Sequence, residues 1–217
     1  MLLYYITDRT QFLGNDQERR ERLLERIALA ASCDIDFVQL REKDLPAREL
    51  ELLARSAVEK VSASGNRTRL LINSRTDIAL ATGADGVHLR STDISPTDVR
   101  SIWRMAGNKI EPAIAVSCHT EQEVISAKKS GVNFVVFGPV FEKKDALLPI
   151  SPNMGGKWGT PLKQLRSVCQ HGITVLALGG ITLENAKLCI QAGAAGVAGI
   201  RLFQRGDLVS TVKKLRD

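Results

Sequence analysis

Short apolar runs alternate with longer amphipathic segments along the chain. The runs are rich in β-branched residues and predict strands at Leu2–Ile6, Phe37–Leu40, Leu70–Ile72, Gly86–Leu89, Ala113–Val116, Phe134–Phe137, Thr174–Leu178 and Gly196–Gly199. The amphipathic segments predict helices at Glu18–Ser32, Ala47–Ala63, Arg75–Ala81, Ser95–Met105, Glu121–Ser130, Pro161–Cys169, Leu183–Ala192 and near Leu208–Leu215. A chain in which each of eight strands is followed by a helix predicts a (β/α)8 TIM barrel.

The strands themselves favour a parallel barrel over an open doubly wound sheet. Most are continuous apolar runs without alternation, as expected of strands covered on both faces. "GADGVHL", "GVNFVVF" and "GAAGVAG" repeat a glycine where a helix gives way to a strand, which predicts left-handed helix ends at Gly83, Gly131 and Gly193. No G-x-G-x-x-G opens the first helix, and no linker interrupts the rhythm. We therefore expect residues 1–217 to form a single TIM-barrel domain.

Composition is consistent with a soluble globular protein and excludes some other classes. The 217 residues are 44% hydrophobic and 25% charged, and no apolar run has the ~20 residues of a membrane span. The start, "MLLYYITDRT", lacks the basic region of a signal peptide, so we expect a cytoplasmic protein with no membrane contact. The four cysteines are scattered, without a C-x-x-C pair, and indicate buried reduced thiols.

The surplus of basic residues suits an anionic small molecule. The net charge is +6, yet segments such as "QERRERLLERI" mix both signs at helical spacing, as a solvated helix face does. We therefore expect no nucleic-acid partner. The three histidines show no metal-binding spacing, so the pattern suggests no transition-metal site.

The second predicted strand ends in three alternating donors. In "FVQLREK", Gln39, Arg41 and Lys43 lie two residues apart, and such residues share one face of a strand. At the carboxyl end of a barrel strand that face is the active-site mouth, where a guanidinium and an ammonium suit phosphate or pyrophosphate. The alternative is that Arg41 and Lys43 pair with acidic neighbours, namely Glu42, Asp44 or Asp93, and only solvate the rim.

Other strand ends carry polar residues as well. Ser117 and His119 close the fifth strand, and "GPVFEKKD" after the sixth brings Lys143 and Lys144. A second phosphate site is indicated at the last two strands, where glycines lead into helices whose backbone N–H groups can bind an anion. It would comprise Gly179, Gly180, Ile200 and Arg201.

A magnesium site is indicated at Asp93. Magnesium binds through one or two carboxylates together with substrate phosphate oxygens. Asn73, at the end of the third strand, is an oxygen partner or a substrate contact. Asp93 could instead cap the helix that begins near Ser95 and Pro96.

Seven motifs in order resemble one enzyme family. "YYITDR", "VQLREK", "LLINSRTDIAL", "GADGVHL", "VSCHT", "FGPVF" and "ALGGIT" are similar to thiamine phosphate synthase and its sister, thiazole tautomerase, over essentially the whole chain. The resemblance implies an Mg²⁺-dependent transferase that couples hydroxymethylpyrimidine pyrophosphate to thiazole phosphate and releases pyrophosphate. Relatives are often homodimers.

The resemblance also implies a role for each matching residue. Gln39, Arg41, Lys43 and Asn73 would hold the pyrimidine pyrophosphate, Ser117 would reach the pyrophosphate, and Asp93 would bind Mg²⁺. Gly180, Ile200 and the backbone of Arg201 would cradle the thiazole phosphate.

Three positions depart from the synthase pattern. Ser74 stands where the synthase has a second metal carboxylate. The loop after "GPVF" lacks a Thr-x-Thr-Lys motif, so Lys143, Lys144 or Lys157 would have to supply its charge. Arg201 replaces a common serine. These departures leave two alternatives to the synthase: a metal-free tautomerase with His119 as acid-base, and a non-catalytic binder of thiamine precursors.

Overall fold

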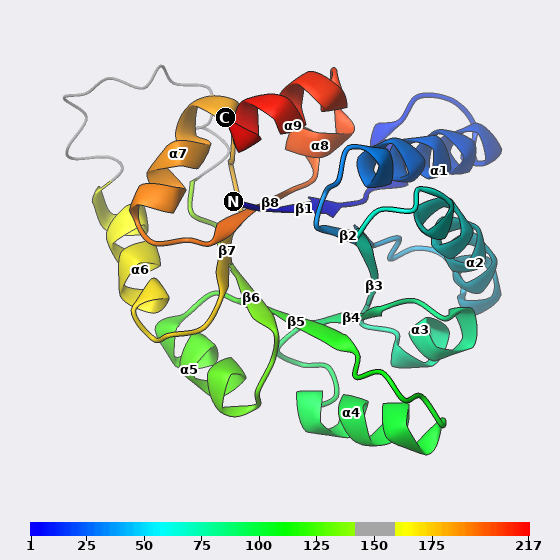
Figure 1. The fold of residues 1–217 in the computed structure, drawn as a ribbon, viewed down its shortest axis with the longest axis horizontal. Helices are drawn as coiled ribbons and strands as arrows, with labels where there is room; N and C mark the ends of the chain where they lie inside the picture. Colours follow the sequence, from blue (N-terminus) through cyan, green and yellow to red (C-terminus); the bar gives the residue numbers. More distant parts are fainter. Residues whose placement is uncertain (142–158) are drawn as a thin grey trace.

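The eight parallel strands form one closed barrel in which neighbours in sequence are neighbours in space. The computed structural model describes residues 1–141 and 159–217. Strand β1 pairs with both β2 and β8, which closes the ring (Figure 1). The strands are β1 Leu2–Ile6, β2 Phe37–Leu40, β3 Arg69–Asn73, β4 Gly86–Leu89, β5 Ala113–Cys118, β6 Phe134–Phe137, β7 Val175–Ala177 and β8 Gly196–Gly199. The predicted TIM barrel is confirmed.

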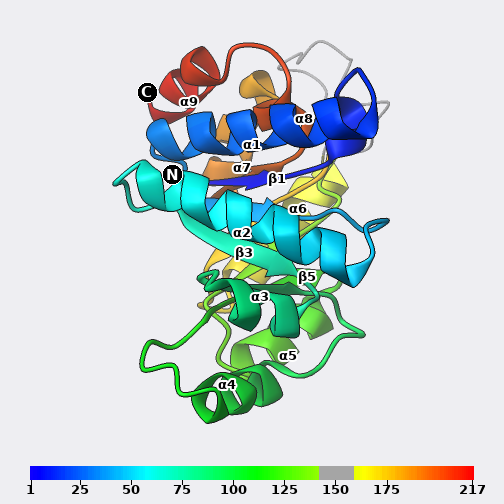
Figure 2. The same cartoon turned by 90° about the vertical axis from the view of Figure 1, so that its right-hand side faces the viewer.

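The helices surround the barrel and run antiparallel to its strands (Figure 2). They are α1 Asp16–Ser32, α2 Ala47–Ala63, α3 Thr76–Thr82, α4 Pro96–Met105, α5 Glu121–Lys129, α6 Gly159–Cys169, α7 Leu183–Gln191, α8 Arg201–Gln204 and α9 Leu208–Arg216. The 3-10 helix η1, Arg9–Gln11, and the short α8 lie outside the predicted helices. Both follow a strand at the end where polar side chains gather. Gly83, Gly131 and Gly193 have positive φ angles, as predicted for these helix ends.

An apolar core fills most of the interior of the barrel. Inward-facing Tyr4, Leu71, Phe134 and Leu176 are buried in one cluster. The Phe134 ring packs edge-on against Tyr4, with centroids 5.5 Å apart, and lies 4.6 Å from the Phe37 ring. A separate core lies between the strands and the helices. With its interior packed, the barrel offers a ligand only its mouth.

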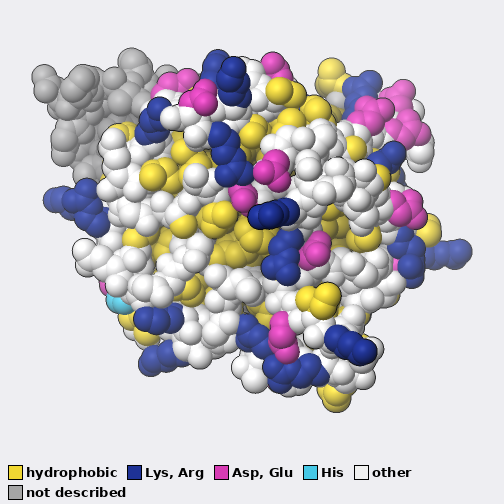
Figure 3. Space-filling view, viewed as in Figure 1, with side chains coloured by type: hydrophobic (Ala, Val, Ile, Leu, Met, Phe, Trp, Pro, Cys, Tyr) yellow, Lys and Arg dark blue, Asp and Glu magenta, His cyan; other side chains and the backbone are white. Residues whose placement is uncertain are grey.

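The opposite end of the barrel carries charges of both signs. Figure 3 looks onto the end where the strands begin and shows basic and acidic side chains interspersed there.

Among the described residues, no helix is both long and apolar enough to cross a membrane. Of the four free cysteines, Cys118 and Cys189 are buried, whereas Cys33 and Cys169 are only half-buried. The prediction of buried thiols is therefore correct for two of the four.

Candidate active site

The donors predicted at the end of β2 line a cavity at the barrel mouth. Gln39, Arg41 and Lys43 face it, and the cavity has a volume of about 390 Å³. The predicted residues Asn73, Ser117 and His119 line the same space, together with His88, Arg90, Ser91, Thr92, Ile6, Leu178 and Ile200. Strands β2 to β5 thus bring their terminal polar side chains to one place.

The acidic residues between these donors face a different partner. Arg9, from η1, forms ion pairs with Glu42 at 3.3 Å and with Asp44 at 2.6 Å. Both Arg9 and Glu42 are buried. Glu42 also accepts hydrogen bonds from the Thr7 hydroxyl at 2.6 Å and the Arg9 backbone N–H at 3.0 Å. Residues that alternate after β2 thus face opposite ways: Glu42 and Asp44 pair with Arg9, whereas Arg41 and Lys43 line the cavity.

Arg41 and Lys43 are consequently available to bind an anionic ligand. In the described parts of the chain neither forms an ion pair, because Glu42 and Asp44 are held by Arg9, and Asp93 by Arg90. The pKa of Lys43 is lowered, first by the charge of Arg41 and then by burial and the charge of Arg90. The alternative in which these donors pair with acidic neighbours is wrong. The cavity has a positive potential that favours an anion.

A line of amide and hydroxyl groups crosses from β2 to β3. The Gln39 side chain donates from Nε2 to Asn73 Oδ1 at 2.9 Å, and Asn73 Nδ2 donates to Ser74 Oγ at 3.2 Å. The oxygen of Asn73 is therefore engaged by Gln39. Ser74 has a φ of 60°, a left-handed conformation uncommon for a residue with a side chain. The turn after β3 is thereby bent tightly next to Asn73, which lines the cavity.

Asp93 closes a turn instead of capping a helix. It accepts from the Arg90 backbone N–H at 2.8 Å and pairs with the Arg90 guanidinium at 2.9 Å. Burial acts to raise the pKa of Asp93, but hydrogen bonds from Arg90 and Ser74 outweigh it and hold the pKa below its usual value. Helix α4 is capped by Ser95, so the predicted cap role of Asp93 is wrong. Asp93 is thus an ionised carboxylate beside Ser74.

The described residues contain no cluster of three or more His, Cys, Asp or Glu side chains that could hold a metal ion. Ser74 contributes a hydroxyl where a second carboxylate would strengthen such a site. The donor set fits Mg²⁺ only as a site with one carboxylate whose other ligands come from substrate and water.

Sequence reasoning did not select two buried residues that support Ser117. His88 Nε2 lies 2.8 Å from Ser117 Oγ, and His88 Nδ1 lies 2.9 Å from the Tyr4 hydroxyl. Burial, aided by the charge of Arg41, lowers the pKa of His88 to about 3, so its ring is neutral. The signal available in the sequence was polarity alone: a histidine inside the apolar run "GVHL".

His119 reaches the same cavity from the end of β5. Its Nδ1 lies 2.5 Å from the Gly138 carbonyl oxygen. A carbonyl only accepts, so Nδ1 carries a proton, and in the neutral form of the ring Nε2 is the acceptor. Helix α5 is capped by Thr120, in a capping box with Glu123. The alternative in which His119 caps this helix is wrong.

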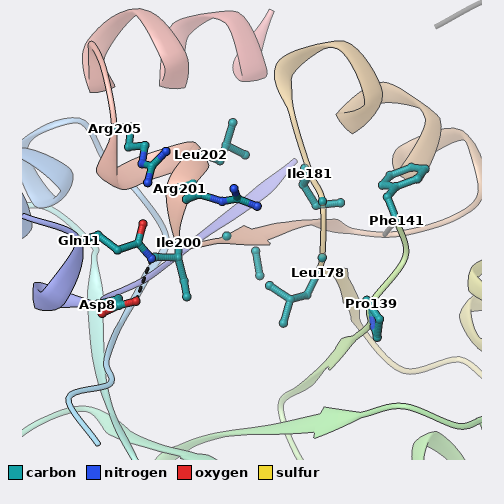
Figure 4. Close-up of a pocket in the computed structure, with 14 residues that line it drawn as sticks. Asp8, Gln11, Pro139, Phe141, Leu178, Ile181, Ile200, Arg201, Leu202 and Arg205 are labelled. Atoms are coloured by element: carbon teal, nitrogen blue, oxygen red, sulfur yellow. Dashed lines mark hydrogen bonds between the residues drawn. The ribbon is translucent and has the colours of Figure 1, made fainter. Parts of the chain in front are cut away.

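A larger cavity of about 870 Å³ opens at the ends of β6, β7 and β8 (Figure 4). Gly179, Gly180, Ile200 and Arg201 all line it, as the prediction of a second site requires. Arg201 extends across the opening toward Ile181 (Figure 4). Leu178 and Ile200 line this cavity as well as the cationic one. The two cavities are therefore neighbours that share a wall.

The two glycines permit the backbone to pass close to the loop after β6. Gly179 has a φ of 97° and Gly180 a φ of 60°. A Cβ on Gly179 would lie 2.6 Å from Pro139 Cα, and one on Gly180 would lie 2.8 Å from Phe141 Cβ. A side chain at either position is therefore excluded by both conformation and space.

Comparison with known proteins identifies the family. The family model described as thiamine monophosphate synthase matches residues 3–203. The chain belongs to this family. It is 38% identical over 202 residues to the putative thiamine-phosphate synthase 2 of Aquifex aeolicus, covering 93% of this chain and 96% of that one. It is 40% identical over 199 residues to the putative thiamine-phosphate synthase of Geobacter sulfurreducens, covering 90% and 83%.

A solved structure agrees with this assignment to the thiamine monophosphate synthase family. The thiamine phosphate pyrophosphorylase of Pyrococcus furiosus superposes with a TM-score of 0.76 at 25% identity, covering 99% of this chain and 93% of that one. The family resemblance inferred from the seven motifs is thus confirmed. The predicted substrate contacts Lys143 and Lys144, like Lys157, lie outside the described residues.

Proposed function

We propose that this protein is a thiamine phosphate synthase, which couples hydroxymethylpyrimidine pyrophosphate to thiazole phosphate and releases pyrophosphate. The similarity to proteins named thiamine-phosphate synthase supports the overall reaction. One observation carries the proposal at the level of the site: a small cationic cavity and a larger apolar cavity share Leu178 and Ile200. Two phosphorylated substrates held there would meet at that common wall.

The cationic cavity suits the departure of pyrophosphate. Bond cleavage places negative charge on the leaving group, and cations that are fixed in advance stabilise that charge most effectively. Arg41 and Lys43 are free of acidic partners among the described residues. Their charge-assisted hydrogen bonds would strengthen as the pyrophosphate leaves. Ser117 would add a neutral donor, and Gln39 and Asn73 would contact the pyrimidine pyrophosphate.

The larger cavity suits the thiazole phosphate. Its lining is mainly apolar, which favours a heterocycle, and it includes Gly180, where no side chain would separate a phosphate from the backbone. Arg201 supplies a guanidinium that crosses the opening (Figure 4). Arg205 also lines the cavity, so a phosphate there would have two guanidinium groups within the same pocket.

Magnesium would be held at Asp93, completed by substrate oxygens. When bound, the ion would neutralise pyrophosphate charge, so synthase turnover should depend on Mg²⁺. Because Ser74 is a poorer ligand than a carboxylate, we propose that the free protein binds Mg²⁺ weakly and that the pyrophosphate substrate completes the site. Ser74→Asp should increase Mg²⁺ affinity of the free protein, measured by calorimetry, and Asp93→Asn should remove that gain.

His119 supports a second candidate function, tautomerisation of carboxythiazole phosphate. Its Nδ1 donates to the Gly138 carbonyl, so in the neutral form of the ring Nε2 is the acceptor, and the side chain lines the cationic cavity. An imidazole in that state can accept a proton from a bound substrate. This reaction needs neither metal nor pyrophosphate.

One assay separates the candidates. Purified protein is given both phosphorylated precursors, with and without Mg²⁺, and thiamine phosphate and inorganic pyrophosphate are measured. Metal-dependent formation of both products supports the synthase. Metal-free isomerisation of carboxythiazole phosphate that is lost in His119→Ala supports the tautomerase. Binding of the precursors without either turnover would refute both enzyme functions and leave a binding protein.

A further inference from the structure

A series of three hydrogen-bonded side chains, called the polar chain below, runs through the apolar interior of the barrel to the cationic cavity. It links the hydroxyl of Tyr4 on β1, the imidazole of His88 on β4 and the hydroxyl of Ser117 on β5. Tyr4 has no exposed surface and His88 is 2% exposed, whereas Ser117 lines the cavity. The rings of Phe37 and Phe134 pack against Tyr4. The polar chain thus has one end in the core and the other at the cationic cavity.

The neutral ring of His88 gives this chain a direction. A neutral imidazole donates from one nitrogen and accepts at the other. Either Tyr4 donates to Nδ1 and Nε2–H donates to Ser117, or both hydrogen bonds run the opposite way. The two directions leave the Ser117 hydroxyl in different states. In the first direction the Ser117 hydroxyl is free to donate its proton to a ligand. In the second direction it donates that proton to His88.

The surroundings of Tyr4 select the first direction. The Tyr4 hydroxyl keeps its proton, because complete burial raises its pKa well above the usual value. In residues 1–141 and 159–217 its one hydrogen-bond partner is His88. If Nδ1 were the donor, the phenol proton would be buried without an acceptor, which costs more than an unused lone pair. Tyr4 therefore donates to Nδ1, and Nε2–H donates to Ser117.

We propose that Tyr4 is a positioning residue which, through neutral His88, fixes Ser117 as a hydrogen-bond donor to the anion in the cationic cavity. This inference rests on the proposed function, since the anion is taken to be pyrophosphate. The oxygens of pyrophosphate accept hydrogen bonds. A serine that offered its lone pairs would repel them, whereas one that offers its proton binds them. The orientation is set within the core, before any ligand arrives.

The direction of the chain is tested by nitrogen NMR of the three histidines at pH 7, with His88 assigned through His88→Asn. The ¹⁵N shifts of a ring separate its protonated from its unprotonated nitrogen. We expect His88 to carry its proton on Nε2. A proton on Nδ1 would overturn the inference whether or not the protein shows synthase turnover.

The consequence is tested with Tyr4→Phe and inorganic pyrophosphate. The variant keeps the packed ring but loses the hydrogen bond that anchors Nδ1 as an acceptor, which weakens the preference for the Nε2 proton and loosens the ring, so we expect pyrophosphate affinity to fall by about two- to ten-fold. Tyr5→Phe is the matched control: Tyr5 is equally buried, and its hydroxyl donates at 3.0 Å to Gln204, away from the cavity. Tyr5→Phe should leave pyrophosphate affinity unchanged.

A double-mutant cycle separates positioning from general loosening of the fold. In a Ser117→Ala background, Tyr4→Phe should cause no further loss of pyrophosphate affinity, because the group it orients is absent. An equal loss in both backgrounds, or an equal loss in Tyr5→Phe, would overturn the inference. If the tautomer and the cycle are as expected but no thiamine phosphate forms, the positioning role stands and the proposed function fails.

Discussion

Replacing Glu42 with glutamine tests the buried ion pair that separates acids from donors beside the site. The Glu42 side chain is 1% exposed and that of Arg9 is 6% exposed. The two carboxylate oxygens of Glu42 accept hydrogen bonds from the Thr7 hydroxyl at 2.6 Å, the Arg9 backbone N–H at 3.0 Å and the Arg9 guanidinium at 3.3 Å. Glutamine has nearly the same shape but offers an NH₂ group in place of one oxygen. With its NH₂ toward Arg9, glutamine sets donor against donor; with its NH₂ toward Thr7, it removes the oxygen that accepts the Thr7 proton, and in both orientations the negative charge beside Arg9 is lost.

The magnitude follows from the partners that remain. Removing one member of a buried pair costs about 3–5 kcal/mol, and losing a hydrogen bond to a charged group costs about 1.5–3 kcal/mol. Arg9 keeps its ion pairs with Asp44 and Asp16, so its charge stays compensated. We expect Glu42→Gln to lower the free energy of unfolding by about 2–3 kcal/mol. For a protein of this size that lowers Tm by about 4–12 °C.

The assay is urea denaturation followed by circular dichroism, with Glu49→Gln as the control. Glu49 pairs with Arg20 on the surface and its side chain is 46% exposed, so its loss should cost less than about 1 kcal/mol. Glu42→Gln should also weaken pyrophosphate binding, because the Arg41 backbone N–H donates to Thr7, which Glu42 holds. If Glu42→Gln and Glu49→Gln lower the free energy of unfolding equally, the buried Arg9–Glu42 pair does not stabilise the loop after β2.

Three further predictions concern the cavities and the core. Arg41→Ala should weaken pyrophosphate binding by about 2 kcal/mol, measured by calorimetry, while Arg55→Ala on the surface of α2 should change nothing. Because His88 is neutral when folded and has a pKa of about 3, unfolding takes up a proton below pH 6.5. Stability should fall by about 1.4 kcal/mol per pH unit from about pH 6.5 toward pH 3, a slope that denaturation of His88→Asn should lack. Gly180→Ala should lower stability and thiazole phosphate affinity by more than Gly206→Ala, because both glycines have positive φ but a Cβ meets a neighbour within 4 Å only at Gly180.

The fold was predictable because its signals are local. Each strand is a short apolar run, and Gly83, Gly131 and Gly193 mark helix ends by their need for positive φ. The predicted strand from Phe37 to Leu40 agrees with β2 to the residue. The short η1 and α8 were missed because three or four residues are too few to show a helical period.

The site was predictable only as far as strand alternation reaches. That Gln39, Arg41 and Lys43 share one face follows from their spacing. The partner of Glu42 did not follow, because Arg9 lies 33 residues earlier and only the parallel pairing of β1 with β2 brings the two residues together. His88 was missed as a site residue for the same reason. Its role depends on Tyr4, which is 84 residues away in sequence.

These long-range pairs explain why "REKD" can carry two acids without cancelling its two cations. Residues 41 to 44 alternate in sign along the sequence, and a flexible loop of that composition would neutralise itself. Here Arg9 forms ion pairs with buried Glu42 and exposed Asp44, while Arg41 and Lys43 face the cavity. The positive potential of the mouth thus depends on an arginine that does not line this cavity. Neutralising Arg9 should therefore weaken anion binding at a distance, since it frees two carboxylates to turn toward Arg41 and Lys43.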